Sequence, residues 1–184
     1  MNNISTSDLD TEYGPLLSPN RVDSAERRLK PLSLHELNSG SATLLEKMMA
    51  TSVEGLKVSS YVFSELPILW IVDKNGKLWF ALEEIVLDAT DKFRYPKPSK
   101  LDVPNEHSKL GHPSLVNAEE ARIAGEMLFD IRAEPPNWYL TNASGRYGLH
   151  KTRNENHLLS VVKLFQKYGI ELKHQFLPAA KMEK

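Results

Sequence analysis

A β-hairpin is the firmest structural prediction from this sequence. Asp73-Lys74-Asn75-Gly76 joins two β-prone runs, one over 67–72 and the other over 77–82. Asn-Gly between such runs is the strongest short-range hairpin signal. Strands joined by so short a turn must be antiparallel neighbours. The first run is apolar at successive positions, so we expect both of its faces to be covered.

The rest of the chain mixes further strands with helices. We expect strands over 56–63, 122–129, 138–142 and 170–176, and helices over 25–30, over 41–49 and from a capping box at 152–155 to a stop at Gly169. Ser33 and Glu36 have the spacing of another capping box. This order predicts an α+β fold: a mainly antiparallel sheet with an N-terminal helix and one C-terminal amphipathic helix.

Two segments are expected to lack regular structure. Residues 1–30 are polar and show no sustained periodicity, so they are interpreted as a flexible tail. The tail precedes a single domain over 31–184, whose motif-bearing core spans about 66–176. Residues 88–105 hold three prolines among charges and are expected to form a long loop, which in compact domains tends to be functional or mobile.

Composition excludes several classes of protein. The 184 residues include no cysteine, which excludes a disulfide framework, a thiol nucleophile and any zinc or iron–sulfur site built on cysteine. A hydrophobic fraction of 41% and a charged fraction of 26% are globular values. A net charge of −1 gives no reason to expect nucleic acid as a partner. No apolar stretch approaches the ~18–20 residues of a membrane span, and the polar start does not form a standard signal peptide.

Basic residues are concentrated towards the C-terminus. The section 144–184 holds eight Lys or Arg and three Glu, a net charge of +5, which leaves −6 for the remainder. Such a section could attract an anionic small molecule or an acidic protein surface. Alternatively, several of these lysines lie on the outer face of one helix.

Three short stretches carry residues that a core does not need. They are His107-Ser108-Lys109-Leu110-Gly111-His112, Ala124-Gly125-Glu126 and Ser144-Gly145-Arg146-Tyr147-Gly148. Glycine permits close backbone approach, histidine exchanges protons near neutrality, and Ser, Arg and Tyr bind oxygen-rich anions. We therefore expect one pocket, with His107, His112 and Glu126 as catalytic residues and Ser108, Ser144, Arg146 and Tyr147 as ligand-binding residues.

The order and spacing of these stretches, followed by a helix and Tyr168-Gly169-Ile170-Glu171-Leu172, resemble a known module. It is the C-terminal module of plant IQ-motif calmodulin-binding (IQM) proteins, which has related modules in bacterial effectors and toxins. The resemblance covers about three fifths of the chain, 68–176. It implies a shared fold and a virulence-type effector or toxin acting on a host or competitor target. It also implies a chaperone or immunity protein as partner. The protein would be cytoplasmic in the producer and secreted by a signal-peptide-independent system.

The chain departs from that family at informative positions. The family's Ser-Gly-His-Tyr reads Ser-Gly-Arg-Tyr here, so an acid or base role of that histidine does not transfer to Arg146. His112 could instead bring an imidazole into the site. Glu126 stands where the plant proteins usually have Arg, so Glu126 and Arg146 could have exchanged charge across a pocket. No IQ motif is present, so calmodulin binding is not implied.

Each candidate residue also has a structural interpretation. His107 and His112 could be two surface-loop histidines. Together with Glu126 they could supply three zinc ligands, but no His-x-x-x-His on a helix supports that, and no metal is predicted. Glu126 shares a strand face with Ala124 and Leu128, so if that face is buried it needs a partner, most simply Arg146. The three tryptophans lie in apolar strands and are expected in the core.

Three functional hypotheses remain open. The first is an effector- or toxin-type domain in which a histidine accepts a proton and Arg146 binds an anionic group, with the reaction class undetermined. The second is a module that binds a ligand or protein without turnover. The third is a structural or regulatory module whose basic C-terminal helix docks an acidic partner. The sequence names no cofactor.

Overall fold

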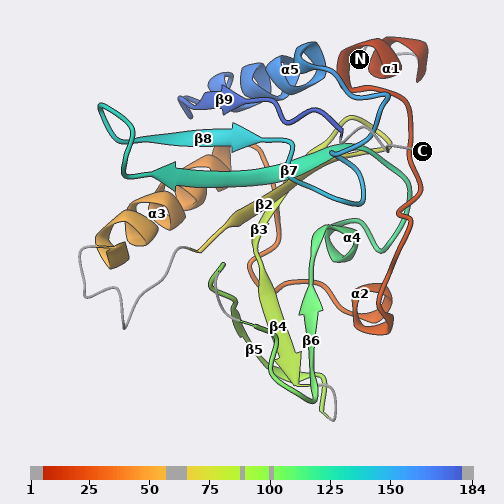
Figure 1. The fold of residues 1–184 in the computed structure, drawn as a ribbon, viewed down its shortest axis with the longest axis vertical. Coiled ribbons are helices and arrows are strands. Elements are labelled where there is room, and N and C mark those ends of the chain that lie inside the picture. Colours follow the sequence, from red (N-terminus) through yellow and green to blue (C-terminus); the bar gives the residue numbers. More distant parts are fainter. Residues whose placement is uncertain (1–5, 57–65, 88–89, 100–101, 180–184) are drawn as a thin grey trace.

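The computed structural model describes residues 6–56, 66–87, 90–99 and 102–179 and contains two sheets (Figure 1). The larger sheet has the spatial order β1 (His35–Glu36), β3 (Leu78–Leu82), β2 (Ile68–Asp73), β7 (Ala121–Asp130), β8 (Asn137–Thr141) and β9 (Lys173–Gln175). The smaller sheet has the order β5 (Lys92–Pro96), β4 (Glu84–Leu87) and β6 (His107–Leu110). Neighbouring strands are antiparallel except β8 and β9, which are parallel. With an N-terminal helix, α1 (Thr6–Tyr13), and the C-terminal α5 (Glu155–Gln166), the fold is α+β as predicted.

The expected hairpin is confirmed. β2 and β3 pair in antiparallel register from Ile68 opposite Leu82 to Val72 opposite Leu78. Gly76 has φ +78°, a conformation that glycine adopts without strain. The carboxylate of Asp73 accepts hydrogen bonds from the backbone N–H groups of Asn75 and Lys77 and so fixes the turn.

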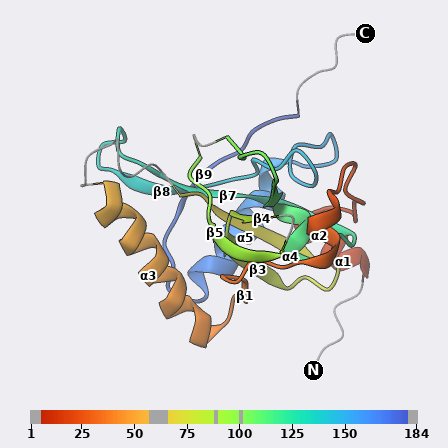
Figure 2. The same cartoon turned by 90° about the horizontal axis from the view of Figure 1, so that it is seen from below.

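Both faces of β2 are buried, as expected from its apolar run. Ile68, Trp70 and Val72 point into the main core, which also contains side chains of α1, α3 (Ser39–Leu56) and α5. Leu69 and Ile71 point to the opposite face, which packs against α4 (His112–Leu115). Figure 2 shows α3 at one end of the larger sheet and α1 with α2 (Ser24–Arg28) at the other. Of the tryptophans, Trp70 and Trp138 are buried in this core and Trp79 is only half-buried.

Residues 6–30 do not form the flexible tail that the sequence suggested. They contain α1 and α2, and Leu9, Tyr13 and Ala25 are buried. The guanidinium of Arg122, which is fully buried, hydrogen-bonds to Asp10 and to the backbone carbonyl of Gly14. Because so few residues of this segment are apolar, their burial produces no periodic pattern in the sequence.

Several local predictions are corrected. Ser33 does not start a helix: His35–Glu36 form β1, and the side chain of Asn38 accepts the first free N–H groups of α3 instead. The expected loop over 88–105 contains β5. The capping residue of α5 is Asn154 rather than Thr152. The strand expected over 56–63 lies outside the described residues except for Leu56, which ends α3.

The chain passes from the larger sheet to the smaller one through a single residue. β3 ends at Leu82, β4 begins at Glu84, and only Glu83 separates them. The two sheets therefore meet at Glu83, and the candidate site lies at this junction. Within the described ranges no helix is both long and apolar enough to cross a membrane.

Candidate functional site

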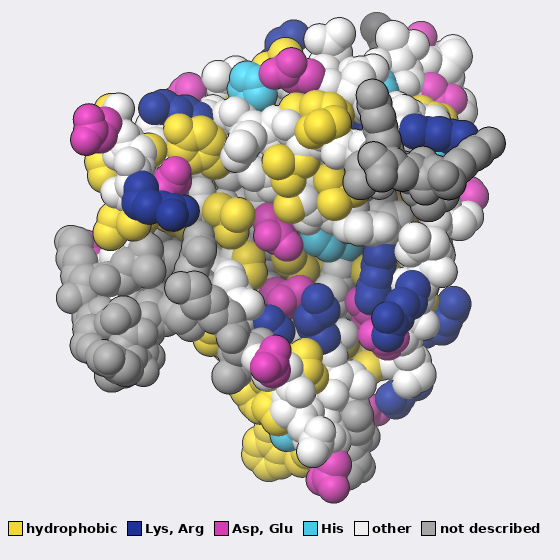
Figure 3. Space-filling model, viewed as in Figure 1, with side chains coloured by type: hydrophobic (Ala, Val, Ile, Leu, Met, Phe, Trp, Pro, Cys, Tyr) yellow, Lys and Arg dark blue, Asp and Glu magenta, His cyan; other side chains and the backbone are white. Residues whose placement is uncertain are grey.

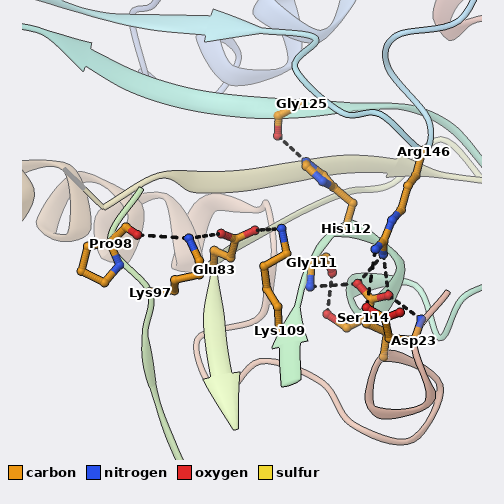
Figure 4. Close-up of polar contacts among 11 residues, drawn as sticks. Asp23, Glu83, Lys97, Pro98, Lys109, Gly111, His112, Ser114, Gly125 and Arg146 are labelled. Atoms are coloured by element: carbon orange, nitrogen blue, oxygen red, sulfur yellow. Dashed lines mark hydrogen bonds and ion pairs between the residues drawn. The ribbon is translucent and has the colours of Figure 1, made fainter. Parts of the chain in front are cut away.

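Glu83 forms ion pairs with two lysines: Lys97, which directly follows β5, and Lys109 on β6 (Figure 4). Its carboxylate lies 3.6 Å from the ammonium of Lys97 and 3.1 Å from that of Lys109. Its backbone carbonyl accepts a hydrogen bond of 2.7 Å from the N–H of Lys97. The side chains of Glu83 and Lys97 are each only 10% exposed, so this ion pair is largely removed from water.

His112 lies beside these charges at the start of α4. Its Nε2 donates a hydrogen bond of 2.9 Å to the carbonyl oxygen of Gly125 on β7. A carbonyl oxygen only accepts, so the neutral ring carries its proton on Nε2 and leaves Nδ1 as an acceptor. Burial, together with the positive charges of Lys109 and Arg146, lowers the pKa of His112 from 6.5 to about 4, and the Gly125 hydrogen bond and Glu83 oppose this only in part. The imidazole is therefore neutral at physiological pH.

Arg146 forms an ion pair with a residue from the N-terminal segment. Its Nη1 donates to both carboxylate oxygens of Glu26, whose side chain is fully buried. The same carboxylate accepts hydrogen bonds from the backbone N–H groups of Gly111, at 3.0 Å, and Asp23, at 2.9 Å. The Asp23 carboxylate lies 3.9 Å from Nη2 of Arg146. The carboxylates that face Arg146 are therefore those of Glu26 and Asp23, whereas the sequence suggested Glu126 as its partner.

We call this group the inter-sheet cluster, and it consists of His112 and six charged residues: Asp23, Glu26, Glu83, Lys97, Lys109 and Arg146. In Figure 3 acidic and basic side chains gather in the middle of the molecular face, between the two sheets, and a histidine lies at the upper edge of the group. Formally the six charges sum to zero.

Glu126 lies next to the cluster on β7. It is paired with Leu69 on one side and Thr141 on the other, and it is half-buried. Strand alternation places it on the same face as Ala124, which packs against α4. His112 hydrogen-bonds to the carbonyl of the residue preceding Glu126. The structure therefore brings His112 and Glu126 to one region.

An open groove of about 760 Å³ lies along β7, β8 and β9. By strand alternation, Leu128, Tyr139 and Thr141 lie on the same sheet face as Glu126. The groove is lined by both apolar and polar residues: Leu128, Phe129, Asp130, Ile131, Arg132, Tyr139, Thr141, His174 and Gln175. A mixed lining of this kind suits a ligand that has both apolar and polar parts.

His107 and Ser108 do not join the site. They lie at the far end of β6, opposite Leu87 and Val86, whereas the end of β6 near the cluster is Leu110. The ring of His107 hydrogen-bonds to the backbone carbonyl of Asn105 and packs edge-on against Tyr95. Both stretches that the sequence left as loop, 107–110 and 112–115, are regular elements. The structure therefore places His107 at the far end of β6 from α4, where His112 lies.

Tyr147 and Ser144 have structural positions in the turn that presents Arg146. The hydroxyl of Tyr147 donates to the backbone carbonyl of Glu119 at 2.9 Å, and burial raises its pKa. The carbonyl of Ser144 accepts from the N–H groups of Gly148 and Leu149. The buried hydroxyl of Ser144 has no hydrogen-bond partner among the described residues. Neither side chain contacts a member of the cluster in an identified bond.

Two glycines let this turn pack on the sheet. A Cβ at Gly125 would lie 1.8 Å from the carbonyl oxygen of Thr141, and a Cβ at Gly148 would lie 2.2 Å from those of Ala124 and Asn142. Close backbone approach, the role expected of the motif glycines, is therefore met at these two positions.

Sequence reasoning missed Glu26, Asp23, Glu83 and Lys97. Glu26 and Asp23 lay in the supposed tail, and Lys97 lay in the supposed loop. Glu83 follows an apolar strand, a position where a charge usually faces water, so its burial had no local signal. The basic residues Lys163, on α5, and Lys167, which directly follows α5, are exposed, and α5 packs on the sheet face opposite α4.

The described residues contain no group of three His, Asp or Glu side chains that could hold a metal ion. The alternative zinc set of His107, His112 and Glu126 is not assembled, because His107 lies at the other end of β6. No family model, no curated protein and no solved structure matches the chain. The resemblance to IQM-type modules stays a prediction.

Proposed function

We propose that the protein is an effector- or toxin-type enzyme domain in which His112 accepts a proton from a nucleophile at the junction of the two sheets. The observation that carries this proposal is the hydrogen bond from Nε2 of His112 to the Gly125 carbonyl. It fixes the ring and leaves a neutral Nδ1 as acceptor, which is the arrangement a general base requires. The effector or toxin context rests on the resemblance to bacterial modules.

Glu126 would stabilise the imidazolium that forms when His112 accepts a proton. It lies one residue from the carbonyl that holds the ring and on the sheet face that α4 covers. A carboxylate near an imidazolium favours its charged form, and Glu83 already acts on the pKa of His112 in this way; Glu126 would add to that effect. The body of the substrate would lie in the groove along β7, β8 and β9, which is lined by Thr141, the β8 partner of Glu126.

The alternative is a module that binds a ligand or protein without turnover. It is favoured by the charge balance of the inter-sheet cluster, in which every cation is already paired with a carboxylate. Such pairs can serve only to hold the two sheets together. The two functions differ in whether His112 is needed for a reaction.

Expression inside bacterial and eukaryotic cells tests the proposal. His112→Gln retains a side-chain N–H in reach of the Gly125 carbonyl but cannot accept a proton as imidazole does, and Glu126→Gln removes only the charge. Both should relieve growth arrest, whereas the matched control His107→Gln should not. Urea unfolding of each purified variant checks that it is folded. Growth arrest by His112→Gln at the wild-type level would overturn catalysis by His112, and a wild type harmless in both hosts would overturn the toxin function.

A further inference from the structure

The carboxylate of Glu26 occupies a position that resembles a bound ligand's. It is fully buried, and it accepts hydrogen bonds from the guanidinium of Arg146 and from the backbone N–H groups of Gly111 and Asp23. Arg146 and Gly111 are distant from Glu26 in the sequence. Guanidinium and backbone N–H groups together are the donors with which proteins bind carboxylate and phosphate. The site next to His112 thus contains an oxyanion already, supplied by the chain itself.

The segment that carries Glu26 has few other anchors. We call residues 18–30 the strap; α2 lies within it. Its apolar contacts are those of Ala25 and the partly buried Leu29 with Val86 and Leu110. Its remaining ties include the surface ion pair of Arg28 with Asp91 and a hydrogen bond from Arg94 to the carbonyl of Lys30. Exposed pairs of this kind contribute little to stability, so Glu26 is the main polar anchor of the strap.

Removing the strap would reverse the electrostatic character of the site. With the strap in place, the inter-sheet cluster has three cations and three carboxylates. Without Asp23 and Glu26 it would keep Lys97, Lys109 and Arg146 with Glu83 as the one carboxylate of the cluster, a net charge of +2. Arg146, whose side chain is 19% exposed, would then lack its carboxylate partners, and a guanidinium beside a backbone N–H group is suited to bind an anion from outside in their place.

We propose that Glu26 is an internal competitor for an oxyanion site formed by Arg146 and the Gly111 amide, and that the strap must move before a substrate bearing a carboxylate or phosphate can bind beside His112. The protein described here is then the latent form. The inference rests on the proposed function for the role of His112, but the oxyanion site itself does not depend on catalysis.

Titration calorimetry with inorganic phosphate tests the site, with acetate as the carboxylate probe. Because the wild type must first release the strap, its apparent affinity is reduced by the fraction of open molecules. Glu26→Ala should therefore bind phosphate at least about tenfold more tightly than the wild type. The gain should disappear in Glu26→Ala combined with Arg146→Gln. The matched control is Glu84→Ala, which removes a buried carboxylate held by residues 32 and 33 and not by an arginine.

Equal affinity of wild type and Glu26→Ala, or a gain that survives Arg146→Gln, would overturn the inference. Glu26→Gln, which keeps the side-chain shape, replaces Glu26→Ala if the latter does not fold.

Hydrogen exchange of the wild-type protein tests the movement of the strap without either variant. Phosphate should accelerate exchange of the Leu29 amide, which is bonded within α2, but not of amides in α5; unchanged exchange at Leu29 would also contradict the strap. These outcomes do not depend on growth arrest by His112→Gln, so the site and the catalytic role can fail separately.

Discussion

Nε2 of His112 donates to the carbonyl oxygen of Gly125 across 2.9 Å, which ties the short helix α4 to the long central strand β7. The bond joins two of the three sequence stretches that were expected to share a site. It also sets the ring tautomer, because a carbonyl oxygen accepts only from a protonated nitrogen. The third stretch reaches the same region through Arg146, whose Nη1 would lie 3.9 Å from a Cβ atom built at Gly111.

Protonation of His112 should destabilise the fold in mild acid. Burial lowers its pKa from 6.5 to about 4, so between these values the unfolded chain binds more protons than the folded one. The free energy of unfolding should therefore hold above pH 6.5 and fall as the pH decreases towards 4, by about 3 kcal/mol. Burial also lowers the pKa of His157, which adds a loss in the same direction. Urea unfolding from pH 4 to 8 measures this dependence.

His112→Gln isolates the contribution of His112 to that pH dependence. The variant should unfold with a shallower pH slope in this window, because glutamine does not titrate. His107→Gln should leave the slope unchanged, since His107 packs against Tyr95 at the far end of β6. An equally steep slope in His112→Gln and wild type would show that folding does not lower the pKa of His112.

Gly125 and Gly148 should not tolerate a methyl group. A Cβ at either position would lie about 2 Å from backbone carbonyl oxygens, which cannot rotate away. We expect Gly125→Ala and Gly148→Ala to reduce the free energy of unfolding by more than about 3 kcal/mol or to prevent folding. Gly145→Ala is the matched control in the same turn: its Cβ would have no neighbour within 4 Å, so the change should stay within about 0.5 kcal/mol. Urea unfolding distinguishes the outcomes, and a stable Gly125→Ala would contradict the packing of Thr141 on β7.

Turn residues and hydrophobic periodicity in the sequence predicted the helices and strands whose formation depends on neighbouring residues. The hairpin, β7, β8 and the apolar face of α5 all follow from turn chemistry and periodicity, and each is present. The helix α1 does not follow from such a pattern, because the main buried partner of its segment, Arg122, is more than a hundred residues away. Only the folded chain shows that the polar segment containing α1 packs against the rest of the protein.

The candidate site was predicted in part for the same reason. His112, Glu126 and Arg146 lie in one region because residues in three motif stretches meet on β7. Nothing in the sequence distinguishes the role of His112 from that of His107. Only the folded chain places His107 on the strand β6 and His112 on the helix α4. The identity of the anion that faces Arg146 is set by tertiary structure, so Glu26 could not be chosen over Glu126 beforehand.

Tyr147→Phe should affect stability and not growth arrest. The hydroxyl of Tyr147 donates to the carbonyl of Glu119, and the ring is 1% exposed. Loss of one buried hydrogen bond should reduce the free energy of unfolding by about 1 kcal/mol. Because the hydroxyl points to Glu119 rather than to Arg146 or His112, the variant should arrest growth as the wild type does. Full loss of growth arrest with an intact fold would restore Tyr147 as a ligand-binding residue.

Arg122 should be the residue on which α1 depends. Its fully buried guanidinium binds Asp10 and the carbonyl oxygens of Gly14, at 3.1 Å, and Lys74, at 3.3 Å. Arg122→Met keeps most of the side-chain length but leaves these groups without their donor, so the free energy of unfolding should fall by about 2–4 kcal/mol. Hydrogen exchange should show the loss first at the Gly14 amide, which donates to the carbonyl of Asp10 at the end of α1. Arg132→Met, at a side chain that is 92% exposed, is the matched control and should change stability by less than about 0.5 kcal/mol. Equal effects of the two substitutions would mean that α1 is held by its apolar contacts, Leu9 and Tyr13, and not by the arginine.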